Sequence, residues 1–132
     1  MEQQNKNANN PVTWFEIYVD DLSRSQKFYE TVLDVKMQDL PDPNNTGTKM
    51  TAFPMKMDAP NASGSLVQME GMKAGGNSTI VYFESADCAK EEARVENAGG
   101  KIYKKKRNIG EHGFMSLCTD TEGNMFGIHS MK

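Results

Sequence analysis

Hydrophobic and polar residues alternate over residues 14–19, in a run rich in residues that favour strands. Asp20 and Asp21 follow, and aspartate is a good N-cap residue for a helix. From Leu22 onwards the apolar residues return at helical spacing, so the pattern predicts an amphipathic helix that ends near Asp34. Shorter runs predict three further strands, at residues 35–40, 48–53 and 65–69.

The same order of elements restarts after a glycine-rich stretch at residues 71–77. Residues 79–84 alternate as a strand, and Asp87 is placed to begin a second helix that Gly99 and Gly100 would end. Three more strands are predicted after this helix, at residues 101–105, 114–118 and 125–128.

The two predicted helix starts, Asp21 and Asp87, stand 66 positions apart (87 − 21 = 66), which is half of the 132 residues. This duplication predicts an α+β fold built from two tandem βαβββ modules. We expect a single domain in which residues 12–70 form the first module and residues 78–132 the second. The linker 71–77 would join them, and the two sheets would form a cleft between the modules.

The composition is that of one globular domain, with 37% hydrophobic and 25% charged residues. The formal net charge of −3 lacks the basic excess of a general nucleic-acid binder, and no apolar run approaches the roughly 20 residues of a membrane helix. Cys88 and Cys118 match no zinc or redox spacing, which is typical of buried thiols in a reducing compartment. Residues 1–11 are polar and are expected to form a disordered tail without a signal sequence, so we expect a cytoplasmic protein.

Three stretches of the chain, taken together, resemble a known family. They are residues 15–33, residues 82–101 and the run Thr-Asp-Thr-Glu-Gly-Asn-Met-Phe-Gly at residues 119–127. In this order, on a duplicated frame, they resemble the vicinal oxygen chelate superfamily, which includes glyoxalase I, bleomycin-resistance proteins and extradiol dioxygenases. The resemblance implies a cleft between two modules and, because members commonly pair their subunits, a homodimer.

Members of this superfamily that carry out chemistry usually bind a divalent metal through four side chains, typically His, Glu or Gln. By resemblance, the four positions here are Trp14, Ile80, Gly127 and a residue near Gln68. The side chains of the first three positions offer no lone pair to a metal. The sequence is therefore similar to a glyoxalase-related branch that lacks the usual ligands, and we predict no metal ligand, no divalent metal and no other cofactor.

Strand alternation predicts which side chains face the cleft. If Trp14 occupies a position equivalent to a ligand, Glu16 and Tyr18 share its face of the strand, and the repeat places Tyr82 in the same way. The predicted ligand-binding residues are Trp14, Tyr18, Gln68, Tyr82, Met115, Met125 and His129.

Glu16 is the predicted catalytic residue. A carboxylate between Trp14 and Tyr18 on a central strand is expected to be buried, where it needs a partner. It would serve as a general base or as an anchor for the ligand. Alternatively, Glu16 is a structural carboxylate that accepts a hydrogen bond from Tyr82 or from a backbone amide.

Two classes of function fit these residues. The first is a glyoxalase-like protein that binds a small apolar or aromatic molecule between the modules, with lyase or isomerase activity through Glu16 and no metal. The alternative is a non-catalytic protein that sequesters such a molecule, as bleomycin-resistance proteins do. A second alternative is a metal-dependent glyoxalase or dioxygenase with a non-standard ligand set, for which His112, His129 and Glu16 are the candidates. Whether the protein is an enzyme stays open at this point.

Overall fold

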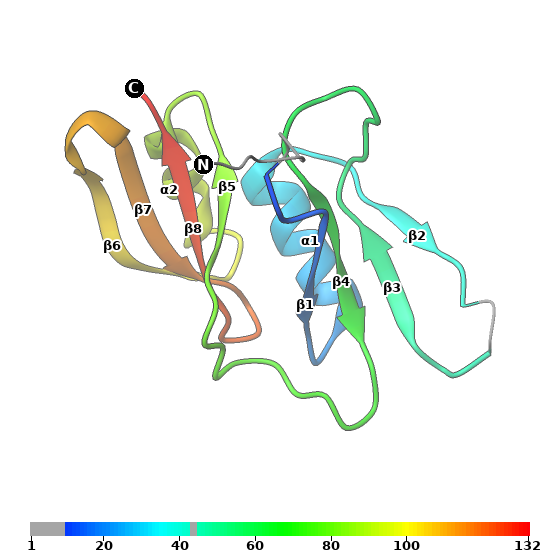
Figure 1. Ribbon diagram of the computed structural model, residues 1–132. Coiled ribbons are helices and arrows are strands. Elements are labelled where there is room, and N and C mark those ends of the chain that lie inside the picture. The colour runs from blue at the N-terminus through cyan, green and yellow to red at the C-terminus, as the bar shows by residue number, and fades with distance from the viewer. Residues whose placement is uncertain (1–9, 43–44) are drawn as a thin grey trace.

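The computed structural model describes residues 10–42 and 45–132, so most of the predicted tail at residues 1–11 lies outside the described part. Two four-stranded sheets stand side by side, each with one helix against it (Figure 1). The first module contains β1 (Trp14–Tyr18), α1 (Leu22–Leu33), β2 (Gln38–Leu40), β3 (Lys49–Ala52) and β4 (Ser63–Gln68). The second contains β5 (Val81–Glu84), α2 (Cys88–Val95), β6 (Lys101–Asn108), the short 3-10 helix η1 (Gly110–His112), β7 (Phe114–Thr119) and β8 (Met125–Ser130).

Both sheets have the same topology, which confirms the predicted pair of βαβββ modules. The strand order is β1-β4-β3-β2 in the first sheet and β5-β8-β7-β6 in the second. β1 runs parallel to β4 and β5 runs parallel to β8, whereas the other neighbours are antiparallel. The first strand of each module is therefore an edge strand, and β1 and β5 border the space between the sheets (Figure 1).

Aspartate residues cap both ends of helix α1. The Asp21 side chain accepts a hydrogen bond from the backbone N–H of Arg24 and so satisfies one of the free donors at the helix start. Asp34 ends the helix in the left-handed conformation, with a φ of 54°. The face between these ends buries Phe28, Tyr29 and Val32 against the sheets.

The two modules share one hydrophobic core. The rings of Phe15 and Phe83, one from each module, have centroids 6.0 Å apart. Phe28 of α1 contacts Phe126 of β8 at 5.8 Å, and Tyr29 lies between the two sheets with its ring against rings of both. Because these aromatic side chains are buried by both modules together, neither module covers its own apolar face alone.

The turn at residues 120–124 joins the second module to the first. Glu122 accepts hydrogen bonds from the backbone N–H groups of Asp20 and Asp21, and Arg24 pairs with it at 2.7 Å. Asp120 accepts a 2.6 Å hydrogen bond from the Tyr29 hydroxyl. These polar contacts fix the second module against the junction of β1 and α1.

No helix in the described ranges is long and apolar enough to cross a membrane.

Candidate functional site

Each sheet has one face against the helices and one open face, which we define as the face turned away from them. In β1, Phe15 and Ile17 pack against the core. Trp14, Glu16 and Tyr18 alternate with them and therefore share the open face of the first sheet.

The second sheet repeats this arrangement. Phe83 of β5 packs in the core, so Tyr82 lies on the open face. Phe126 and Ile128 of β8 are buried in the core, which places Met125 and His129 on the open face. Met115 pairs with His129 across β7 and β8 and shares that face. Contact of these residues with a ligand stays a prediction.

Gln68 does not lie where the sequence predicted. It is separated by two positions from the core residue Leu66, so its side chain points to the helix side of β4. Its Oε1 accepts a 2.8 Å hydrogen bond from the backbone N–H of Leu22, one of the free donors at the start of α1. The prediction that Gln68 faces the cleft is wrong, because its neighbour Val67, the partner of Tyr18, occupies the open face instead.

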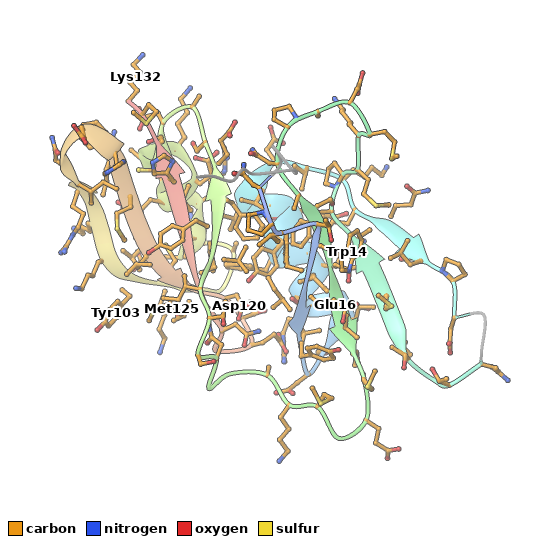
Figure 2. All side chains as sticks on the ribbon, viewed as in Figure 1. Trp14, Glu16, Tyr103, Asp120, Met125 and Lys132 are labelled. Carbon is orange, nitrogen blue, oxygen red and sulfur yellow. The ribbon has the colours of Figure 1, made fainter. Side chains whose placement is uncertain are left out.

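A groove of about 340 Å³ lies between the inner edges of the two sheets. β1 contributes Glu16 and Tyr18 to its walls, and Met125 at the start of β8 lies on the other side. Figure 2 shows Glu16 on β1 of the first sheet and Met125 at the start of β8 in the second sheet. The linker supplies much of the remaining lining, including Met72, Lys73, Gly75 and Asn77.

The groove gathers only part of the predicted set. Trp14 lines a separate hollow of about 370 Å³ with Met55 and Met57 from the loop between β3 and β4. Tyr82, Met115 and His129 lie on the open face of the second sheet and are not among the residues that line the groove. Apart from Gln68, the predicted residues therefore lie in three places: the groove, the hollow beside Trp14 and the open face of the second sheet.

Glu16 is exposed, so the predicted burial of its carboxylate is wrong. Its Oε1 accepts a 2.9 Å hydrogen bond from the hydroxyl of Tyr18, two residues along the same strand, and not from Tyr82. The physical reason is that β1 is an edge strand, with β4 on one side and the groove on the other. The hydrogen bond to Glu16, with a smaller contribution from burial, raises the pKa of Tyr18.

Sequence reasoning missed the residues that hold the linker in place. The Asn124 side chain accepts a 2.6 Å hydrogen bond from the N–H of Gly75 and donates a 3.0 Å bond to the carbonyl of Tyr18. Asp20 accepts from the N–H of Ala74 at 3.1 Å. One amide thus connects the linker wall of the groove to β1. The sequence signal for this role is the turn within residues 119–127, the run that also carries the family resemblance.

Comparisons with known proteins now identify the fold. The model of bleomycin resistance protein-like N-terminal domains matches residues 12–50. Glyoxalase I from Zea mays matches with a TM-score of 0.73 at 21% identity, over 92% of this chain and 46% of that chain. TnmS3, an antibiotic binding protein from Streptomyces sp. CB03234, matches with a TM-score of 0.65 at 21% identity, over 94% of this chain and 98% of that chain. The chain has the glyoxalase/bleomycin-resistance fold.

Two further comparisons define the extent of this similarity. A glyoxalase-related enzyme from Fulvimarina pelagi has a TM-score of 0.65 at 15% identity, over 92% of this chain and 88% of that chain. This chain spans about half the length of the maize glyoxalase I. No curated protein matches the sequence.

The divalent metal that the resemblance implies does not fit the side chains found here. Trp14 and Ile80 carry no ligand atom, Gly127 has no side chain, and Gln68 is turned to α1. Within residues 10–42 and 45–132, no group of three or more His, Cys, Asp or Glu side chains is placed to hold a metal ion. We therefore derive no chemical step through a metal.

The two histidines do not complete a site with Glu16 either. His129 Nε2 lies 2.6 Å from the backbone oxygen of His112, and this contact requires the ring nitrogen to donate, since a carbonyl oxygen only accepts. His129 therefore binds the turn that η1 forms. Glu16 is hydrogen-bonded to Tyr18 on the other sheet.

Proposed function

We propose that this protein belongs to the vicinal oxygen chelate superfamily and binds a small apolar or aromatic molecule in the groove between β1 and β5 without converting it. The observation that carries the proposal is the groove itself, which combines Ile17, Val81 and Met125 with the hydrogen-bonded pair Glu16 and Tyr18. Apolar walls with a few fixed polar groups are typical of small-molecule sites, and its volume is at the lower end of their range.

The polar pair has a defined role in this proposal. The Tyr18 hydroxyl donates a hydrogen bond to Oε1 of Glu16, which leaves the second carboxylate oxygen of Glu16 to accept a hydrogen bond from the ligand. The raised pKa of Tyr18 keeps its hydroxyl protonated at neutral pH. Ile17 and Val81 would remove apolar surface of the ligand from water.

Binding is favoured over catalysis for two reasons. The exposed position of Glu16 lacks the apolar burial that prepares a carboxylate as a general base. The positions that hold the metal in catalytic relatives carry side chains that cannot bind one. Two comparisons point in the same direction, namely the bleomycin resistance model and the antibiotic binding protein with the same fold.

A lyase or isomerase that uses Glu16 is the second candidate. The orientation of this carboxylate by Tyr18 favours it, because a positioned carboxylate is what proton transfer requires. The two candidates differ in what Glu16→Gln does. Loss of turnover with ligand affinity retained would indicate catalysis, whereas a parallel loss of affinity in the absence of turnover supports binding.

We also propose a homodimer. The surface around Trp14, Met55 and Met57 exposes large apolar side chains, and a second copy related by a twofold axis would cover them. Sedimentation equilibrium at micromolar concentration tests this, and a monomer mass would contradict it.

The groove is tested by blocking it. We expect a panel of planar aromatic and saturated apolar compounds to include members that shift the backbone amide signals of Glu16, Ile17 and Val81 in NMR spectra. Thr79→Trp places a large ring in the groove wall and should abolish these shifts. Thr31→Trp, at another exposed threonine, on α1 and outside the groove lining, should leave them intact. If no compound shifts the groove signals, or if the two variants behave alike, the groove is not the site.

A further inference from the structure

The ring of Tyr82 covers Gly127. The two residues are partners in the parallel pair of β5 and β8, and both lie on the open face. A Cβ atom added to Gly127 would fall on the Cδ2 and Cε2 atoms of the Tyr82 ring, closer than real atoms approach. Only a glycine at position 127 therefore allows the ring to rest on the backbone of β8.

One side of this ring remains available. Tyr82 is 46% exposed although its ring rests on Gly127, so the surface away from β8 faces solvent. Among the described contacts its hydroxyl forms no hydrogen bond. An aromatic ring held against a strand on one side and open on the other is a surface on which a second planar ring can stack.

The surroundings of Tyr82 connect it to the groove. Met125 and His129 flank Gly127 on β8, and Leu117 is the partner of Gly127 on β7. Met125 also lines the groove. Val81, the residue before Tyr82 on β5, lines the groove as well, so Tyr82 adjoins two positions of the groove lining.

Position 127 is also where the resemblance to metal-binding relatives implies a carboxylate ligand. Here the space above the strand is taken by the Tyr82 ring, and a glutamate side chain at position 127 would displace it. Position 127 therefore lacks a metal-binding side chain, and in addition the Tyr82 ring occupies the space that such a side chain would need.

We propose that Tyr82 is a stacking platform for the planar aromatic part of the ligand and that it sets the preference of the site for flat rings. This rests on the proposed function, since the ligand is the one bound in the groove. The competing explanation is that the ring only shields the backbone at a strand glycine. The two differ in whether removal of the ring changes affinity for a planar compound more than for a saturated one.

The test uses proflavine, a planar tricyclic cation, and 1-aminoadamantane, a saturated cation of similar charge. The affinity of the 132-residue chain is measured by fluorescence for proflavine and by calorimetry for 1-aminoadamantane. We expect Tyr82→Ala to weaken proflavine binding about tenfold and Tyr82→Phe to change it less than about twofold. Binding of 1-aminoadamantane should change less than about twofold in both variants.

Gly127→Ala is a second variant that keeps the tyrosine but forces its ring off the strand. We expect it to weaken proflavine binding as Tyr82→Ala does, with folding checked by circular dichroism. Equal proflavine affinities of Tyr82→Ala and Tyr82→Phe would overturn the platform, as would equal losses for both probes.

The failure of the platform can be told from the failure of the groove. If Thr79→Trp abolishes proflavine binding and Tyr82→Ala does not weaken it, the platform is wrong and the groove stands. If proflavine binds but responds to neither change, both are wrong. If wild-type protein does not bind proflavine, the platform is wrong, and the NMR panel decides on the groove.

Discussion

The hydroxyl of Tyr29 donates a 2.6 Å hydrogen bond to the carboxylate of Asp120, and both residues are buried. The bond joins α1 of the first module to the turn between β7 and β8 of the second. Asp120 also accepts from the N–H groups of Glu122 and Asn124, so its carboxylate organises the turn as well as the contact.

Loss of this hydroxyl should destabilise the protein. Tyr29→Phe leaves the carboxylate of Asp120 buried with one donor fewer, which is expected to lower the free energy of unfolding by about 1–3 kcal/mol. Urea unfolding measures the change. Tyr82→Phe removes an exposed hydroxyl and serves as the control, with a change within about 0.5 kcal/mol. Equal stability of the two variants would contradict a structural role for the bond.

Asp120 and Glu122 should respond to pH in opposite directions. Burial raises the pKa of Asp120 above its usual 3.8, so the folded protein binds its proton more tightly than the unfolded chain does. The contribution of Asp120 to the free energy of unfolding is therefore present below pH 3.8 and is lost as the pH rises through the raised pKa. Burial opposes the shift of Glu122, but hydrogen bonds led by that from Arg24 lower its pKa below 4.5. The contribution of Glu122 is therefore present above pH 4.5 and is lost as the pH falls through the lowered value.

The measurement is the unfolding free energy of wild type, Asp120→Asn and Glu122→Gln at a series of acidic pH values. The stability of wild type relative to Asp120→Asn should fall as the pH rises above 3.8. Its stability relative to Glu122→Gln should rise over the acidic range towards pH 4.5. Parallel slopes for the two comparisons would show that the shifts are assigned wrongly.

Gln68 should matter for the fold and not for the ligand. Gln68→Leu removes the acceptor of the Leu22 N–H and should cost about 1 kcal/mol of stability. Gln68→Glu keeps an acceptor at the positive end of α1 and should retain most of the stability. Neither change should alter the affinity of a groove ligand. A loss of affinity in Gln68→Leu without a loss of stability would show that Gln68 binds the ligand.

Glu16 should control the ionisation of Tyr18. In Glu16→Gln the negative charge beside the hydroxyl is gone, so the pKa of Tyr18 should move back towards its usual 10.0. Ultraviolet titration of the phenolates, with Tyr18→Phe to assign the signal, measures this shift. The free energy of unfolding should change by no more than about 0.5 kcal/mol, because Glu16 is exposed. An unchanged Tyr18 titration would mean that the pair does not form in solution.

Metal should not be retained. After incubation with zinc, nickel or iron(II) and dialysis, we expect less than stoichiometric metal in the protein, because positions 14, 80 and 127 offer no ligand atom. Elemental analysis decides this. Stoichiometric metal that is lost in His129→Ala would show that a non-standard ligand set exists.

Alternation along β1 indicated which residues share a face, whereas the position of Gln68 came only from the family resemblance. In β1, Glu16 is exposed between Phe15 and Ile17, which pack against the core. In β4, Leu66 and Val67 are both buried although they point to opposite faces. The local pattern therefore does not mark the open face of β4, and a shift of one residue moves a side chain to the other face, as it does for Gln68.

The exposure of Glu16 and the role of the turn at residues 120–124 could not be predicted for a different reason. Whether a strand face is covered depends on layers elsewhere in the chain, which local pattern does not report. Asn124 and Glu122 act on partners around 100 positions earlier, at Tyr18 and Asp21. The repeat predicted that the modules exist, but not which polar groups connect them.

The contact between Tyr29 and Asp120 also shows that the two halves of the chain differ at equivalent positions. The half-length offset maps Tyr29 to Val95 and Asp120 to Pro54, and neither side chain can form a hydrogen bond. Each half therefore holds one member of the pair and lacks the other. Two copies of the first half, or two of the second, could not form this bond in either direction. The duplicated halves have become complementary parts that are no longer interchangeable.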